Sequence, residues 1–264
     1  MEFSCCIEMI YTTFPFEERI GKVAQAGFNY FEFWNWNNKD LDGIKRAIAK
    51  YNIHPITFQG SLNGVMVDKN DKATYIEDVK RSLKMAKELG AKTLFCMSDI
   101  MQEDRSVKPH PRFISDDEAA QSSIDVLKAL APIAEEAGVT LICEPLNTLV
   151  DHKGYSLHSS VVGLEIVREV NSPYVKLLYD AYHMQIMEGN IIDTIVKNVQ
   201  YFGHFHIADV PGRNQPGTGE MNYVNIIHAL KKAGYNRVVG FEFAPVNGDD
   251  DAIARNILTM VKNA

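Results

Sequence analysis

Eight short apolar runs alternate with amphipathic stretches along the whole chain, and this alternation restricts the fold more than any other feature. The predicted strands are Phe3–Ile7, Tyr30–Phe33, Ile53–Phe58, Thr93–Cys96, Thr140–Cys143, Val175–Tyr179, Tyr201–His206 and Val238–Phe241. The predicted helices are Phe16–Ala26, Leu41–Tyr51, Asp71–Leu89, Asp116–Ala137, Ser160–Val170, Asn190–Val199, Tyr223–Ala233 and Asp249–Val261. Strands that alternate with helices indicate parallel pairing through crossover connections.

The ends of several helices support the same interpretation. Three of them run into the next strand through an alanine, a glycine and an apolar residue, centred on Gly27, Gly138 and Gly234. Glycine readily takes the left-handed conformation that ends a helix. Eight such units without a linker predict an α/β protein, a (β/α)8 TIM barrel formed as a single domain by residues 1–264. An open doubly wound sheet is the alternative, although the chain has no glycine-rich dinucleotide turn.

Charge and cysteine content restrict the partners and the compartment. The net charge is -7 and the basic residues are scattered, which argues against nucleic acid as a partner. The four cysteines lie in predicted strands and form no CxxC pair, which indicates reduced thiols in a cytoplasmic protein. No apolar run approaches the roughly 18 residues that cross a membrane, and the start shows no signal-peptide pattern. We therefore expect a cytoplasmic protein that binds neither nucleic acid nor a membrane.

Chemistry-bearing residues stand at the ends of the last four predicted strands. Glu144, Asp180 and Glu242 each follow a run, and His206 ends one. The carboxyl ends of barrel strands meet at one rim, where the active sites of such barrels lie. Three carboxylates and one imidazole form a donor set that suits a divalent metal ion of the Mn²⁺ or Mg²⁺ type, with Co²⁺, Fe²⁺ or Zn²⁺ also open.

Any one of these four residues could instead be a helix N-cap or a solvated loop residue. All four together favour a site, because a carboxylate among apolar neighbours is costly to desolvate unless it is paired or ligates a metal. Two further polar residues are expected near the rim, His183 in a loop after Asp180 and Arg213 in the loop after the seventh strand. Either could be structural, but the planar fork of an inward-pointing Arg213 would suit an anionic substrate group.

Four other polar or aromatic residues lie near the ends of the first three predicted strands. They are Glu8, Glu32, Trp34 and Gln59. We expect them to line the pocket or support the structure, and the sequence assigns them no chemical role.

Four segments of the chain, Ile142–Asn147, Leu178–His183, His204–Arg213 and Gly240–Pro245, resemble the hydroxypyruvate isomerase family of xylose-isomerase-like barrels. The resemblance extends over nearly the whole chain. It implies that Glu144 and Glu242 are the proton donor and acceptor, and that both join Asp180 and His206 in holding a metal. It also implies that His183 and Arg213 contact the substrate, and that the protein forms a homo-oligomer.

The chain departs from this family pattern at two positions. Many hydroxypyruvate isomerases carry Gln where this chain has His206, which makes the site similar to that of ketose 3-epimerases and favours a bound metal. Those epimerases typically carry a substrate-binding Glu where this chain has Val150. His206 therefore favours an epimerase substrate, whereas Val150 counts against one.

The resemblance therefore implies an intramolecular oxidoreductase, an aldose–ketose type isomerase. Its expected substrate is a small hydroxy-oxo acid such as hydroxypyruvate, and proton transfer would pass through an enediolate. The alternative is a ketose 3-epimerase acting on free sugars of the D-tagatose or D-psicose type. An abasic-site endonuclease is disfavoured by the charge of -7. A sugar-binding barrel without chemistry is disfavoured by the intact pair of glutamates.

Overall fold

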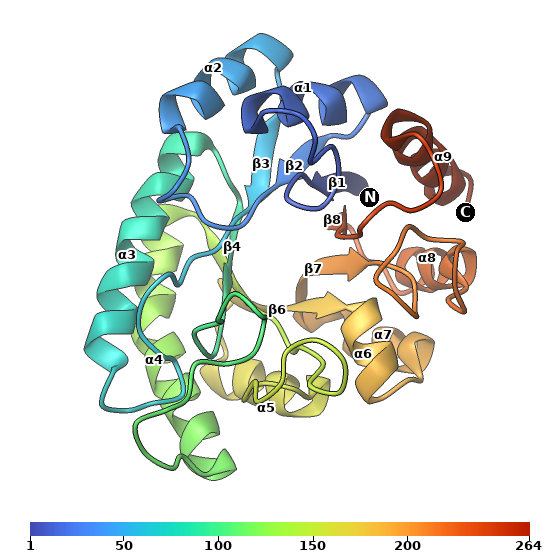
Figure 1. The fold of residues 1–264 in the computed structure, drawn as a ribbon. Helices are drawn as coiled ribbons and strands as arrows, with labels where there is room; N and C mark the ends of the chain where they lie inside the picture. Colours follow the sequence, from blue (N-terminus) through green and yellow to red (C-terminus); the bar gives the residue numbers. More distant parts are fainter.

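Eight parallel strands form the centre of the protein, and nine α-helices pack outside them in the computed structural model, which describes residues 1–264 (Figure 1). The strands are β1 (Glu2–Cys6), β2 (Tyr30–Glu32), β3 (His54–Thr57), β4 (Thr93–Cys96), β5 (Thr140–Cys143), β6 (Val175–Asp180), β7 (Phe202–Ile207) and β8 (Val238–Phe241). The helices are α1 (Phe16–Ala26), α2 (Leu41–Tyr51), α3 (Lys72–Leu89), α4 (Asp116–Ala137), α5 (Ser160–Val170), α6 (Ala181–Met187), α7 (Ile191–Asn198), α8 (Tyr223–Lys232) and α9 (Asp250–Asn263).

The strands close into a barrel. Their order is β3-β2-β1-β8-β7-β6-β5-β4, so the first strand pairs with the last, and the remaining gap lies between β3 and β4. Backbone hydrogen bonds bridge this gap: Phe95 donates to Phe58 at 3.1 Å, and Gly60 donates to Phe95 at 2.8 Å. The predicted (β/α)8 barrel is therefore confirmed, and the doubly wound alternative is wrong because that fold leaves two free sheet edges.

The predicted glycine caps lie where helices turn back into strands. Gly27 and Gly138 end α1 and α4 with φ values of 96° and 67°, in the left-handed region. The amide of each donates to carbonyls of the preceding helical turn. Gly234 follows the last residues of α8 with a φ of 87°. Each of these turns leads the chain to the amino-terminal end of the next strand.

One continuous cluster of 70 buried residues joins the barrel interior to the helix layer, so the chain has a single core. The ring of Tyr179 stacks on Phe202 and Phe205, with centroid distances of 4.7 and 5.6 Å. All four cysteines are buried and free of disulfides. No helix combines the length and apolar character needed to cross a membrane.

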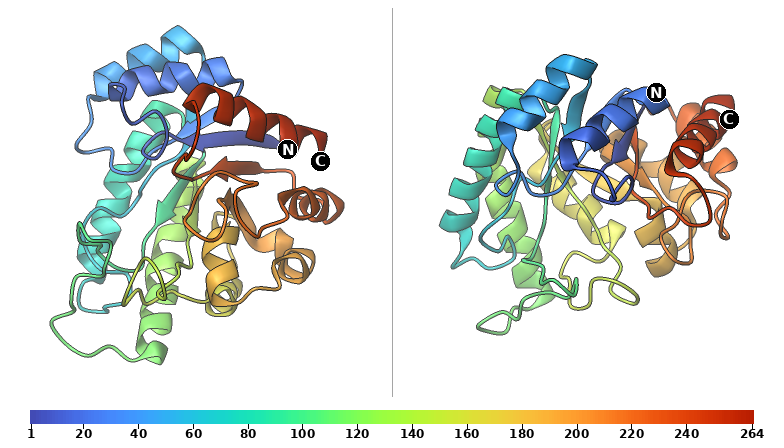
Figure 2. Two further views of the ribbon diagram at one scale, coloured as in Figure 1. Left: turned by 45° about the vertical axis from the view of Figure 1, so that its right-hand side comes forward. Right: turned by 45° about the horizontal axis from the view of Figure 1, so that its top comes forward.

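The long loops after β4 and β5 project from the same end of the barrel (Figure 2). The two chain termini lie near each other beside β1 and α9 (Figures 1 and 2). The end of the barrel that carries the loops after β4 and β5 also carries the polar residues that follow the strands. A site can therefore form at this end.

The structure corrects the sequence prediction after the sixth strand. The predicted loop containing His183 is the short helix α6, which begins directly at Ala181. The Asp180 side chain caps it, since Oδ1 accepts a hydrogen bond from the amide of Tyr182 at 2.7 Å. The prediction failed because no turn residue separates strand from helix, and the seven residues of α6 are too few to show a helical period.

Leu177 on β6 tests the packing between barrel and helices. Its side chain is fully buried and lies against Gly163 of α5. We expect Leu177→Ala to lower the free energy of unfolding by about 2–5 kcal/mol, because it leaves a cavity in this layer. Leu149→Ala is the matched control, since Leu149 is 72% exposed. Urea denaturation of both variants measures the difference, and equal stabilities would contradict the assigned packing.

Candidate active site

The four predicted rim residues meet at the carboxyl end of the barrel. The candidate ligand atoms of Glu144, Asp180, His206 and Glu242 all lie within 4.8 Å of one another. Asp180 and His206 are paired residues of β6 and β7, which places them at the same level. Glu144 and Glu242 directly follow β5 and β8. Residues far apart in the chain therefore converge because parallel strands end at one rim.

Three of the four side chains present an unpartnered polar atom. Glu144 Oε1, Asp180 Oδ2 and His206 Nδ1 are buried and have no hydrogen-bond partner. His206 Nδ1 lies 3.8 Å from Glu144 Oε1 and 4.0 Å from Asp180 Oδ2. It lies 3.4 Å from Glu242 Oε2. Buried polar atoms without partners are costly, and a shared cation would satisfy all of them. These residues therefore form a group that can hold a metal ion.

Neighbouring groups orient the candidate ligands. Asp180 uses Oδ1 to cap α6 and leaves Oδ2 directed at the group. Glu242 Oε1 accepts from the Trp34 indole at 2.8 Å, and Glu242 Oε2 accepts from Arg213 Nη2 at 2.5 Å. Asp180 therefore caps a helix, as the structural alternative for this residue expects, and it is also a candidate ligand.

The environment raises the pKa of two carboxyl groups. Burial raises the pKa of Glu144 to about 7, against the opposing influence of the nearby His206 ring. Burial also raises the pKa of Asp180, although Arg213 and His206 favour its charged form. Removing a carboxylate from water disfavours its charge, and the neighbouring carboxylates add to that effect.

The pKa of the second glutamate, Glu242, shifts in the opposite direction. Burial alone would raise the pKa of Glu242, but the charges of Arg213 and His206 outweigh it and hold the pKa well below its usual value. The pKa of His206 lies well above its usual value, because the surrounding carboxylates outweigh the effect of burial. Without a metal, Glu242 is therefore ionised at neutral pH and Glu144 can carry a proton.

A cavity of about 580 Å³ opens onto this group. Glu144, His206, Glu242 and Arg213 line its inner part. Trp34, Gln59, Gln102, Arg105 and His152 contribute to its remaining walls. Gln102 and Arg105 come from the loop after β4, and His152 comes from the loop after β5. A cavity of this size is typical of small-molecule sites.

The two predicted substrate contacts lie in different places. Arg213 lines the cavity, only 8% exposed, and its guanidinium lies 5.5 Å from the centre of the Tyr182 ring. His183 is fully buried and is not part of the cavity wall. Its Nδ1 accepts from the backbone and side-chain amides of Asn147, at 3.2 and 2.7 Å. Its Nε2 lies 3.7 Å from Asp180 Oδ2, so His183 packs behind a candidate ligand.

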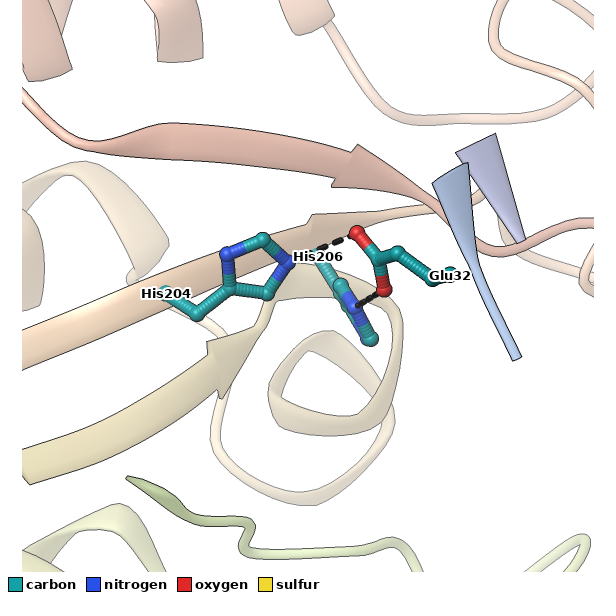
Figure 3. A group of neighbouring side chains, drawn as sticks. All are labelled: Glu32, His204 and His206. Atoms are coloured by element: carbon teal, nitrogen blue, oxygen red, sulfur yellow. Dashed lines mark hydrogen bonds and ion pairs between the residues drawn. The ribbon is translucent and has the colours of Figure 1, made fainter. Parts of the chain in front are cut away.

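The sequence analysis gave no chemical role to Glu32, whose side chain lies beneath the four candidate metal ligands and contacts one of them, His206. Glu32 is 2% exposed, and its carboxylate meets both His204 and His206 (Figure 3). Its position in an apolar strand was the available signal, because a buried carboxylate requires partners. Trp34 lines the cavity, as expected for a residue that lines the pocket or supports the structure, but its indole contact with Glu242 could not be inferred from local sequence.

Comparison with known proteins identifies the family of the chain. Residues 20–263 match the family model described as xylose isomerase-like TIM barrel. The chain belongs to this family. The family that the sequence motifs predicted is therefore confirmed.

The relatives of the chain within the xylose isomerase-like family include named isomerases. It is 27% identical to hydroxypyruvate isomerase of Escherichia coli K12, over 93% of this chain and 94% of that protein. It is also 27% identical to 2-oxo-tetronate isomerase of Cupriavidus necator, with the same coverages. The expectation of an isomerase is confirmed at this level.

Solved structures share the fold of this chain. A Brucella melitensis protein described as AP endonuclease, family 2, is 27% identical and superposes with a TM-score of 0.86, covering 98% of this chain and 99% of that one. D-psicose 3-epimerase of Clostridium cellulolyticum H10, solved with D-tagatose, has a TM-score of 0.79 at 22% identity, covering 100% of this chain and 99% of that one. These likenesses extend over the entire barrel.

The metal site can be tested by thermal unfolding. Protein stripped with EDTA should unfold at a higher temperature when Mn²⁺ is added, because a ligand at 100 times its Kd stabilises the native state by about 2.7 kcal/mol. We expect Asp180→Asn to lose most of this increment and Glu188→Gln, which is absent from the cavity wall, to keep it. An unfolding temperature that does not respond to Mn²⁺ would count against the site.

Proposed function

We propose that this protein catalyses aldose–ketose type isomerisation of a small hydroxy-oxo acid such as hydroxypyruvate, assisted by Mn²⁺ or Mg²⁺ held by the rim residues. The observation that carries the proposal is a pair of glutamates, Glu144 and Glu242, that meet with Asp180 and His206 at one cavity. In the metal-free protein their pKa values shift in opposite directions, as for carboxyl groups that act as acid and base in one reaction. The names of the curated relatives support the choice of substrate class.

Glu144, Asp180, His206 and Glu242 would hold the ion. When bound, the ion would polarise the substrate carbonyl and stabilise negative charge on the substrate oxygens. A divalent charge would also favour the ionised form of the carboxyl groups around it. The chemistry of the donor set fits this assignment, since carboxylate oxygens and one imidazole suit Mn²⁺.

The proton transfers are assigned to the two glutamates. Glu242, held ionised by Arg213, would remove a proton from the hydroxyl-bearing carbon. The electron pair of that C–H bond then forms the enediolate. Glu144 would give a proton to the neighbouring carbon, while the hydroxyl proton moves to the former carbonyl oxygen. One C–H bond is broken and one is formed, so the carbonyl moves by one carbon. Glu242 then releases its proton to water and Glu144 takes one up from water, which restores the starting state for the next turnover.

Arg213 would bind the substrate carboxylate. Its side chain is buried at the cavity wall, and its Nε has no hydrogen-bond partner. Only one contact of its guanidinium, that of Nη2 with Glu242, is an ion pair. The remaining N–H groups can form charge-assisted hydrogen bonds with an anionic group. His183 lies one layer farther from the cavity, so its proposed influence on substrate passes through Asp180.

Replacing the two glutamates tests the proton transfers. Glu144→Gln and Glu242→Gln should each lower kcat about 10²–10⁴-fold, the usual contribution of a general acid or base. Circular dichroism should show that both variants remain folded. Glu188→Gln is the matched control and should keep wild-type turnover, since its carboxylate contacts only Ser159 and Ser160. Full turnover by both folded site variants would refute the mechanism.

A ketose 3-epimerase acting on free sugars is the second candidate. The cavity of about 580 Å³ favours it, because a three-carbon acid fills only a small part of such a space. The exposed side chain of Val150 disfavours a typical 3-epimerase, since it lies outside the cavity wall and has no polar atom for a sugar hydroxyl. The acidic net charge gives a nuclease no comparable support.

Arg213 separates the two candidates. If the substrate is an oxo acid, Arg213→Gln should lower kcat/KM about 10–100-fold, which corresponds to the ~1.5–3 kcal/mol of a charged hydrogen bond. Neutral ketoses from three to six carbons should lose less, because for them the variant removes only the ion pair with Glu242 and no carboxylate contact. The measurement is a panel of hydroxy-oxo acids and ketoses assayed with both proteins. A wild-type preference for neutral ketoses would favour the epimerase.

A further inference from the structure

A carboxylate bridges two histidines at the base of the candidate metal site. Glu32 Oε2 lies 2.7 Å from Nε2 of His206, and Glu32 Oε1 lies 2.8 Å from Nε2 of His204 (Figure 3). The Ser4 hydroxyl donates to the same Oε1. Glu32 comes from β2, Ser4 from β1 and both histidines from β7. Three strands therefore hold one buried carboxylate across the barrel.

The packing around this carboxylate leaves little freedom. A Cβ atom at Gly240 of β8 would lie 2.2 Å from Glu32 Oε1 and 2.7 Å from His206 Cδ2. His204 and His206 are two residues apart on one strand, so both side chains point to the barrel interior. The missing side chain of Gly240 thus leaves the space in which the Glu32 carboxylate bridges His204 and His206.

The bridge determines which nitrogen of His206 is available to a metal. An ionised carboxylate only accepts hydrogen bonds, so the Nε2 atoms of His204 and His206 must both carry hydrogen. Nδ1 of His206 is then the ring atom left to ligate, and it faces the carboxylates of Glu144 and Glu242 without a hydrogen-bond partner. A metal-bound histidine generally donates its other ring N–H in this way.

We propose that Glu32 is a positioning residue for the candidate metal site: it fixes the ring of His206 so that Nδ1 points at the ion. His204 and Ser4 hold the carboxylate from its other side. Glu32, His204 and His206 do not make a second metal site, because both Nε2 atoms are already at hydrogen-bond distance from the carboxylate oxygens. The inference rests on the proposed metal, although Glu32 itself takes no part in the proposed proton transfer.

A double-mutant cycle tests whether Glu32 acts through His206. Mn²⁺ titrations of metal-stripped full-length protein would compare wild type, Glu32→Gln, His206→Ala and the double variant. Glutamine offers one carbonyl oxygen and one NH₂ group, so it can accept from only one of the two rings. We expect Glu32→Gln to weaken Mn²⁺ binding about 10–100-fold in the wild-type background. In the His206→Ala background the further loss should be no more than about twofold, which is within the usual additivity error of about 0.3–0.5 kcal/mol.

A second readout is independent of metal. In ¹⁵N-histidine-labelled wild-type protein, the buried Nε2–H groups of His204 and His206 should give slowly exchanging, downfield ring signals. Glu32→Gln should remove or strongly shift at least one of them. Glu32→Asp, which keeps the charge but retracts the carboxylate, should weaken both Mn²⁺ binding and these signals. Glu188→Gln is the control for loss of a hydrogen-bonded carboxylate, and it should leave both readouts unchanged.

The outcomes separate this proposal from the proposed function. Wild-type protein that binds no Mn²⁺ would remove the metal from the mechanism, while the ring signals would still report whether Glu32 orients the histidines. Equal losses in both backgrounds, or wild-type affinity in Glu32→Gln, would overturn the positioning role. If neither Glu32 variant folds, the residue is structural and the proposal fails.

Discussion

The ring of His206 lies between carboxylates on two sides, and the site depends on this arrangement. Glu32 meets Nε2 from below at 2.7 Å, while Glu144, Asp180 and Glu242 face Nδ1 from the rim at 3.4 to 4.0 Å. Several buried like charges in one place are tolerated only when positive charge lies among them. The imidazole provides it in the metal-free protein, and a divalent ion would provide it more completely.

Arg213 makes the site asymmetric. Its contact with Glu242 holds one glutamate in the charged form, while Glu144 has no such partner and its pKa rises to about 7. Two residues of the same type thereby acquire different proton affinities from their surroundings alone. The barrel supplies this difference because each strand end has different neighbours, although all the ends lie on one rim.

Much of this organisation could be predicted from local patterns in the chain. The alternation of apolar runs and amphipathic helices indicated the barrel, and the position of Glu144 directly after a run placed it at the rim. Glycines such as Gly138 marked helix ends because few other residues take the left-handed conformation cheaply. The helix at Ala181–Met187 could not be predicted in this way, because its cap is also the last residue of a strand.

The sequence by itself determined the eight strands and the residue types at their ends, because both follow from periodicity and from the order of the chain. Only the tertiary structure decided which of those residues meet. Glu32 and His206 are 174 positions apart, and their contact exists because the closed barrel brings β2 and β7 to one interior. The ion pair between Arg213 and Glu242 was likewise decided by folding, because neither local propensity nor spacing predicts the direction of a loop side chain. The proton affinities in the site follow from those long-range contacts and from burial, so they could not be derived before the fold.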